Sequence, residues 1–221
     1  MKKFLAVLLG LSLCSCQTYN QIHNKDEKSL ANSFEQKKSA SIEDVKAIQK
    51  KLKLVYSSRE IDNTINRMAK EMNAKFKDKN PIAVCVLQGS LPFVGRLLPK
   101  LSFNMEFDCL YISSFEGEER KDLKWVMKPR VDCKGRDVIL FDDVVDSGLT
   151  LATLVQFYKD CGAKNVYTAV LTDKKGVRHP NGLQQVDFVG FSVPGDYFLV
   201  GYGLDYDGYL RNLPGIYIVN H

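Results

Sequence analysis

The stretch VILFDDVVDSGLTL, residues 138–151, decides the fold because a strand, a turn and the start of a helix follow one another within it. Its apolar opening is typical of a strand buried on both faces. Asp142 and Asp143 end this apolar run, and the chain then turns through residues 146–148 into a helix. Ligands of open α/β sheets bind outside the carboxyl ends of the strands, so this turn is the expected binding site.

The same turn has the chemistry of a phosphate site. Free N–H groups and the dipole at a helix N-terminus favour an anion. Ser147 and Thr150 add hydroxyl donors, and Gly148 lets the backbone approach a ligand closely. An acidic pair beside a phosphate needs a bridging group, which Mg²⁺ or the hydroxyls of a sugar provide. We therefore expect a ligand with a phosphate at one end and a polyol or metal at the other.

Two other interpretations of the acidic pair stay open on these residues alone. In the first, Asp142 and Asp143 are a solvated strand end, and Ser147 merely caps a helix. In the second, the pair is the acidic pocket of a receiver domain, although receivers place such a pair near the start of the domain. Ligand binding is favoured over both.

Strand-like and helix-like segments alternate on both sides of this stretch. Residues 57–60 form a capping box, and the apolar spacing that follows predicts a helix over 58–77. Further helices are expected over residues 42–54, from Ser90 onward and over 148–161. Strands are expected at residues 82–88, 105–113, 137–141, 166–171, 187–193, 197–203 and 216–219. This order predicts an α/β fold with a mostly parallel sheet covered by helices on both faces.

The composition is that of a folded enzyme or binding domain. With 221 residues, 45% hydrophobic and 26% charged, the chain is not disordered, collagenous or a coiled coil. Of the net charge of +5, residues 1–50 carry +3 through eight lysines and five acids, and a nearly neutral remainder argues against a nucleic-acid partner. The three histidines are too scattered for a metal cage, and there is no GxSxG, GxxxxGK[ST] or complete GxGxxG motif.

Residues 1–16 have the features of an export signal. Lys2 and Lys3 precede an apolar run over residues 4–13, which is shorter than the roughly 20 residues that span a bilayer. Residues 13–16 (LCSC) resemble a bacterial lipobox with Cys16 as the lipidated residue, while an ordinary cleaved signal or a plain helix are the alternatives. Residues 17–40 read as a polar tether, and residues 41–221 as the folded domain.

The cysteines of the body conflict with export. Cys85, Cys109, Cys133 and Cys161 show no disulfide pattern, and the first two lie in apolar runs where a thiol is usually buried. This usage favours a reducing, cytoplasmic compartment, whereas residues 1–16 suggest a lipid-anchored membrane protein. The localisation stays unresolved at this stage.

Several separated motifs resemble the bacterial hypoxanthine-guanine phosphoribosyltransferases of the type I phosphoribosyltransferase family. Residues 138–151 resemble that family's phosphoribosyl-pyrophosphate loop. The other matching segments are, in order, LVYSSREIDNTINRMAKEM, LQGSLPFVGRLLP, YISSFEGEE, LTDKKGVRHP, DFVGFSVP and VGYGLDYDGYLRNLPGIYIV. The resemblance covers about residues 42–221. It implies the type I fold with a small hood and an Mg²⁺-dependent purine salvage enzyme, which transfers 5-phosphoribosyl to hypoxanthine or guanine and releases IMP or GMP and pyrophosphate.

The resemblance also implies roles for individual residues. Asp146 would accept a proton from the purine, and Lys174 would donate to its 6-oxo group; Phe198 would stack on the base. The implied phosphoribosyl-pyrophosphate ligands are Gln88, Gly89, Asp142, Asp143, Ser147, Gly148, Leu149, Thr150 and Arg211. The implied purine ligands are Lys174, Phe198, Leu199 and Asp205, the metal ligands are Asp142, Asp143 and Asp205, and the closing loop contains Ser113, Ser114 and Phe115. Closure of that loop would exclude water.

Each of these residues also has an ordinary interpretation. Lys174 alone could be a solvated loop lysine, Phe198 a core aromatic, and Asp205 with Arg211 a surface ion pair. The family often has lysine at Gln88, tyrosine at Phe115 and glutamate at Asp142, and it often holds the pyrophosphate turn through a cis peptide, which Gln88-Gly89 can adopt. We expect activity to survive these differences.

The alternative to an enzyme is a ligand-sensing regulator with the same fold, but a sensor needs no proton acceptor such as Asp146. Family members are usually dimers or tetramers, so a homodimer or homotetramer is expected. The sequence does not rank hypoxanthine, guanine and xanthine.

Overall fold

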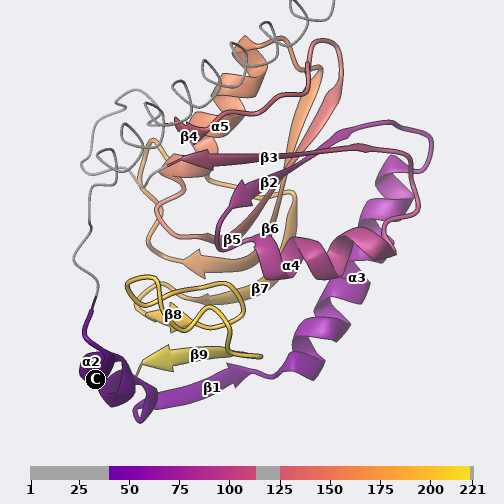
Figure 1. The fold of residues 1–221 in the computed structure, drawn as a ribbon. Helices are drawn as coiled ribbons and strands as arrows, with labels where there is room; N and C mark the ends of the chain where they lie inside the picture. Colours follow the sequence, from indigo (N-terminus) through magenta and orange to yellow (C-terminus); the bar gives the residue numbers. More distant parts are fainter. Residues whose placement is uncertain (1–39, 113–124, 220–221) are drawn as a thin grey trace, which may run out of the picture. The chain divides into compact units, whose positions relative to one another are not determined.

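The computed structural model describes residues 40–112 and 125–219, which form two β-sheets (Figure 1). The larger sheet has six strands in the order β4-β3-β2-β5-β6-β7. Its strands are β2 (Ile82–Leu87), β3 (Glu106–Ile112), β4 (Trp125–Met127), β5 (Asp137–Val145), β6 (Asn165–Lys175) and β7 (Phe188–Pro194). The neighbours from β3 to β7 are parallel, and β4 is antiparallel at the edge. The mostly parallel sheet is thus confirmed.

The smaller sheet is antiparallel, and together with the loop residues 195–198 and 201–215 it is called the hood below. It contains β1 (Leu52–Tyr56), β9 (Ile216–Val219) and β8 (Leu199–Val200), in that order. The hood brings together the first and last strands of the described chain, because β1 pairs with β9 from Leu52 opposite Val219 to Tyr56 opposite Ile216.

The helices are α2 (Ile42–Gln49), α3 (Ser58–Phe76), α4 (Leu91–Leu97) with the 3-10 turn η1 (Leu98–Lys100), and α5 (Leu149–Asp160). The predicted capping box of α3 is confirmed. The Ser57 hydroxyl accepts from the Glu60 N–H, and the Glu60 carboxylate accepts from the Ser57 N–H at 2.8 Å. Among the residues described, no helix is both long and apolar enough to cross a membrane.

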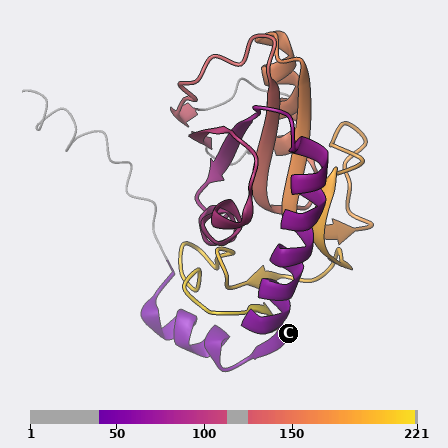
Figure 2. The ribbon, with the colours of Figure 1, turned by 90° about the vertical axis from the view of Figure 1, so that its right-hand side faces the viewer.

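Alternate residues of the central strands enter two separate cores, which explains their continuous apolar sequence. On one face, Ala83 and Cys85 of β2 pack with side chains of α3 and α4. On the other face, Val84 and Val86 pack with side chains of α5. Figure 2 shows α3 along one side of the sheet. The expectation of helices on both faces is therefore confirmed.

Several predicted elements differ in extent, and the strand expected over 166–171 continues to Lys175. The helix expected over 42–54 ends at Gln49, because the residues after it pair with β9. The strand expected over 197–203 is reduced to Leu199–Val200, since Gly201 and Gly203 have positive φ and turn the chain. The strand expected over 137–141 continues to Val145, because Val144 and Val145 still pair with β6.

Candidate active site

A cavity of about 290 Å³ lies at the carboxyl end of β5. Its lining combines the end of β2, the end of β5, the following turn and the start of α5. Among the predicted site residues, those in the lining are Asp142, Asp143, Asp146, Ser147, Gly148 and Thr150. The cavity therefore lies at the turn where the sequence predicts ligand binding.

The acidic pair lies inside this cavity rather than in solvent. Asp142 is buried, with 8% of its surface exposed, and Asp143 is half-buried. Burial raises the pKa of Asp142 well above its usual range, and the neighbouring Asp143 charge adds to this effect. Burial also raises the pKa of Asp143. The interpretation as a solvated strand end is wrong, and the pair favours a ligand that supplies positive charge or hydroxyl donors.

The turn into α5 depends on glycine. Gly148 is the N-cap residue of α5 and has φ of 78°. A Cβ atom at Gly148 would lie 2.8 Å from the Leu183 nitrogen, so a larger residue does not fit. Ser147 does not cap the helix as its N-cap residue, but its hydroxyl accepts from the Leu149 N–H at 3.4 Å. The first turn of α5 lines the cavity, and free amide groups at a helix start favour a phosphate there.

The structure brings together the two residues predicted to act on the purine. The Lys174 ammonium donates to the Asp146 carboxylate at 2.7 Å. The Lys174 side chain is 14% exposed, so it is not a solvated loop lysine, while that of Asp146 is 55% exposed. An accessible carboxylate in this position can accept a proton from a ligand, and the ammonium group beside it can donate a hydrogen bond to an oxygen of the same ligand.

Sequence reasoning missed Arg178, whose guanidinium contacts the backbone of both residues of this pair. Its Nη1 donates to the carbonyl oxygens of Val145 at 3.0 Å and Lys174 at 3.2 Å, and also to that of Asp146. Its Nη2 donates to the buried carboxylate of Asp173. Arg178 lies in the quoted LTDKKGVRHP motif, four residues after Lys174, which was the available signal. The guanidinium fixes the backbone of both Asp146 and Lys174.

The turn after β2 closes the other side of the acidic pair. The cis peptide bond is Leu87–Gln88, so the expected position at Gln88-Gly89 is wrong by one residue. A Cβ atom at Gly89 would lie 1.7 Å from a carboxylate oxygen of Asp143. A Cβ atom at Gly203 of the hood would lie 1.9 Å from the Gly89 carbonyl oxygen. The turn is therefore in close contact with both the acidic pair and the hood.

The hood supplies the remaining predicted side chains. Arg211 pairs with Asp205 at 2.8 Å, and its Nη1 donates to the Gly203 carbonyl at 2.6 Å. The Arg211 charge also counters the rise in the pKa of Asp143. The ion pair of Asp205 and Arg211 thus exists, with about a third of each side chain exposed, although neither residue is among those that line the cavity.

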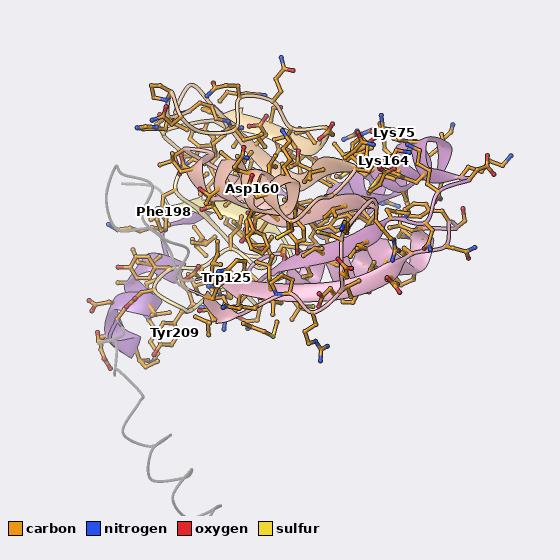
Figure 3. All side chains as sticks on the ribbon, turned by 90° about the horizontal axis from the view of Figure 1, so that it is seen from above. Lys75, Trp125, Asp160, Lys164, Phe198 and Tyr209 are labelled. Carbon is orange, nitrogen blue, oxygen red and sulfur yellow. The ribbon has the colours of Figure 1, made fainter. Side chains whose placement is uncertain are left out.

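Phe198 has the accessibility of a ligand-binding ring. Its surface is 46% exposed, which contradicts a role as a core aromatic. Its ring packs edge-on to Tyr206, with the centroids 6.1 Å apart, and Leu199 beside it is buried. Figure 3 shows Phe198 at the same end of the molecule as Tyr209, opposite Lys75 and Lys164.

The predicted metal ligands fit an ion that a substrate helps to bind. Within residues 40–112 and 125–219, no three acidic, histidine or cysteine side chains form a metal-binding group, so Asp205 does not join Asp142 and Asp143 around one ion. Mg²⁺ commonly takes one or two carboxylates together with phosphate oxygens and water. The buried like-charged pair and the separate Asp205 suit that mode.

Some predicted features lie outside the described residues. These are the closing-loop residues Ser113, Ser114 and Phe115, and the lipobox residue Cys16. Of the described cysteines, Cys85 and Cys133 are buried, Cys109 is half-buried and Cys161 is exposed, and all four are free thiols.

A mostly parallel sheet, an acidic pair before a glycine-led helix start and an antiparallel hood define a phosphoribosyltransferase-type site. The family model described as "Phosphoribosyl transferase domain" matches residues 54–207, and the chain belongs to this family.

Two relatives and one solved structure are similar to the chain over about three quarters of its length. The chain is 36% identical over 166 residues to the hypoxanthine-guanine phosphoribosyltransferase of Bacillus subtilis, covering 74% of this chain and 91% of that protein. It is 34% identical over 164 residues to the enzyme of the same name from Mycoplasma genitalium, covering 73% and 91%. A crystal structure of a hypoxanthine-guanine phosphoribosyltransferase from Bacillus anthracis superposes with a TM-score of 0.68 at 28% identity, covering 76% and 97%.

Proposed function

We propose that this chain is a purine salvage enzyme that transfers 5-phosphoribosyl from phosphoribosyl pyrophosphate to hypoxanthine or guanine. The observation that carries the proposal is the Lys174–Asp146 contact at 2.7 Å, because Asp146 also lines the cavity that contains the acidic pair and the start of α5. One site thus combines groups for a phosphate, for ribose hydroxyls and for a 6-oxopurine.

The sugar phosphate binds along the turn between β5 and α5. The 5′-phosphate accepts hydrogen bonds from the backbone and hydroxyl groups of residues 147–150. Asp142 and Asp143 accept from the ribose 2′- and 3′-hydroxyls. Because burial raises the pKa of both acids, hydroxyl donors or a bound cation lower the cost of ionising them. This turn therefore holds the reacting C1 atom in position.

The purine binds between Lys174 and the hood. Lys174 donates to the 6-oxo group, which selects oxo over amino purines, and Phe198 stacks on the base beside Leu199. Asp146 accepts the proton that the purine loses as its nitrogen bonds to C1. Positioned proton acceptors of this kind contribute about 10²- to 10⁴-fold in rate. Holding both substrates in one orientation adds a further gain.

The leaving pyrophosphate is stabilised by Arg211 and by the turn of Gln88 and Gly89, while Asp205 would act on it through a bound Mg²⁺. Gln88 has no charge, so its amide contributes hydrogen bonding alone. Asp142 and Asp143 would hold one Mg²⁺, and Asp205 would hold a second, each together with substrate oxygens. When bound, Mg²⁺ neutralises charge that develops on the pyrophosphate.

A turnover assay tests this proposal. The full chain is incubated with phosphoribosyl pyrophosphate, Mg²⁺ and hypoxanthine, guanine or xanthine, and the nucleotide product is measured. We expect turnover with hypoxanthine or guanine, and a loss of at least about 100-fold in Asp146→Asn. Phosphoribosyl-pyrophosphate binding in that variant should persist. A wild type that binds the pyrophosphate substrate without turnover would instead support the ligand-sensing regulator.

Two finer proposals concern the protein as a whole. Cys16 is proposed as the site of a lipid anchor, on the resemblance of residues 13–16 to a lipobox. Cys16→Ala should then abolish lipid labelling and membrane association, and membrane association that persists would refute the anchor. We also propose that the protein assembles as a homodimer or homotetramer, because members of the family usually do. Light scattering of the purified chain, which measures the mass of the assembly, tests this proposal.

A further inference from the structure

Helix α2 precedes the residues that the family model matches and packs against the hood. It covers Ile42–Gln49, whereas the family model matches residues 54–207. Residues 40–221 nevertheless form one compact unit. Figure 1 shows α2 beside the strands of the hood, away from the helices that cover the large sheet.

Two contacts fasten this segment to the hood. Val45 is 6% exposed and forms a small core with Val200 and Leu210, against which Tyr209 also packs. Figure 3 shows Tyr209 beside the helix. At the other contact, the backbone N–H of Ala40 donates to the Asp207 carboxylate. Residues 40–49 are thus held both by apolar packing and by a hydrogen bond from the backbone.

Each contacted hood residue lies within two positions of a residue with a proposed ligand role. Val200 follows Leu199, and Leu210 precedes Arg211. Asp207 lies in the turn that Asp205 closes by accepting from the Gly208 N–H at 2.7 Å. The far side of the cavity, built by β5 and α5, has its own core, and α2 is not part of it.

The hood turn needs such support because its backbone is held in an uncommon conformation. Asp207 has φ of 48° and Leu210 has φ of 70°, in the left-handed region that few residues other than glycine adopt. Residues held there persist when surrounding contacts fix them. The contacts of residues 40–49 reach both positions.

We propose that residues 40–49 are a positioning element for the purine side of the site. This inference rests on the proposed function. The segment holds the hood so that Leu199 and its neighbour Phe198 keep the geometry that binds the base. The 5′-phosphate site in the β5–α5 turn is independent of it. Weakening α2 therefore weakens purine binding and leaves sugar-phosphate binding intact.

Two full-length variants with matched controls test the inference. Val45→Asp places a carboxylate in the small core, and Ala47→Asp places the same group on the exposed side of the same helix. Ala40→Pro removes the donor to Asp207, and Ala40→Gly keeps it. The measurements are the KM for hypoxanthine or guanine, and the affinity for ribose 5-phosphate as a probe of the β5–α5 turn.

We expect Val45→Asp and Ala40→Pro to raise the purine KM by roughly 3- to 30-fold, with ribose 5-phosphate affinity unchanged and both controls like wild type. An unchanged purine KM in both variants would overturn the inference. A parallel loss of ribose 5-phosphate affinity would also overturn it, because that result indicates general destabilisation. Failure of the proposed function is distinguishable, since the wild type would then form no nucleotide.

Discussion

Arg178 offers the sharpest test of how the site is held, and Arg178→Met is the informative change. Methionine keeps an unbranched apolar side chain but removes the charge and every donor. The variant loses the bonds to three backbone carbonyls, those of Val145, Asp146 and Lys174, and the bond to Asp173. Asp173 is 2% exposed and then keeps a single ion-pair partner in the described chain, the mostly exposed Lys175.

The expected cost follows from this geometry. Removing one partner of a buried ion pair typically costs about 3–5 kcal/mol, because the remaining charge stays buried. Lys175 still compensates Asp173, so we expect the lower end of this range, about 3 kcal/mol. For a domain of this size, 1 kcal/mol shifts Tm by about 2–4 °C, so Tm should fall by roughly 6–12 °C. Loss of the carbonyl contacts should also displace Asp146 and Lys174 and lower kcat.

The assay is thermal unfolding together with turnover of three variants. In Asp173→Asn with Arg178→Met, the buried charge is absent, so much of the lost stability should return while kcat stays low. Arg178→Lys restores the charge but cannot donate in the same planar arrangement, so it should recover stability better than activity. A Tm within 2 °C of wild type in Arg178→Met, or a double variant no more stable than the single one, would refute this reasoning.

Three further predictions concern the acidic pair, the turn and the core. Gly89→Ala should abolish turnover with the fold intact by circular dichroism, since its Cβ would lie 1.7 Å from an Asp143 oxygen; near-normal turnover would contradict the close contact. Burial raises the pKa of Asp142, so the ionisation of this carboxyl opposes folding. The free energy of unfolding of the ligand-free protein should therefore fall as the pH rises from the pKa of an unfolded aspartate, about 4, through the raised pKa of Asp142. Asp142→Asn should raise Tm at pH 7 and weaken ribose 5-phosphate binding; an unchanged or lower Tm would count against the buried charge. Phe76→Ala should lower the free energy of unfolding by about 3–5 kcal/mol in urea titrations, because Phe76 is fully buried and contacts three aromatic rings; a loss below about 1 kcal/mol would contradict that packing.

The local elements could be predicted because their causes are local. No distant partner is needed to predict the strand, glycine turn and helix of residues 138–151, or the capping box of Ser57 and Glu60. The elements of the hood were less accessible to prediction. Residues 52–54 continue the apolar pattern of α2, but pairing with β9 makes them a strand, and that partner lies at the other end of the chain.

The sequence by itself determined the acidic strand end, the glycine-led helix start and the types of residue around them, because strand and helix periodicity and turn chemistry act over a few neighbouring residues. Tertiary structure alone decided which of these residues meet. Asp146 and Lys174 are 28 positions apart, and they touch because β5 and β6 are parallel neighbours with Val145 paired to Asp173. Arg178 and α2 acquire their contacts in the same way, since strand register and the pairing of the hood place distant segments side by side.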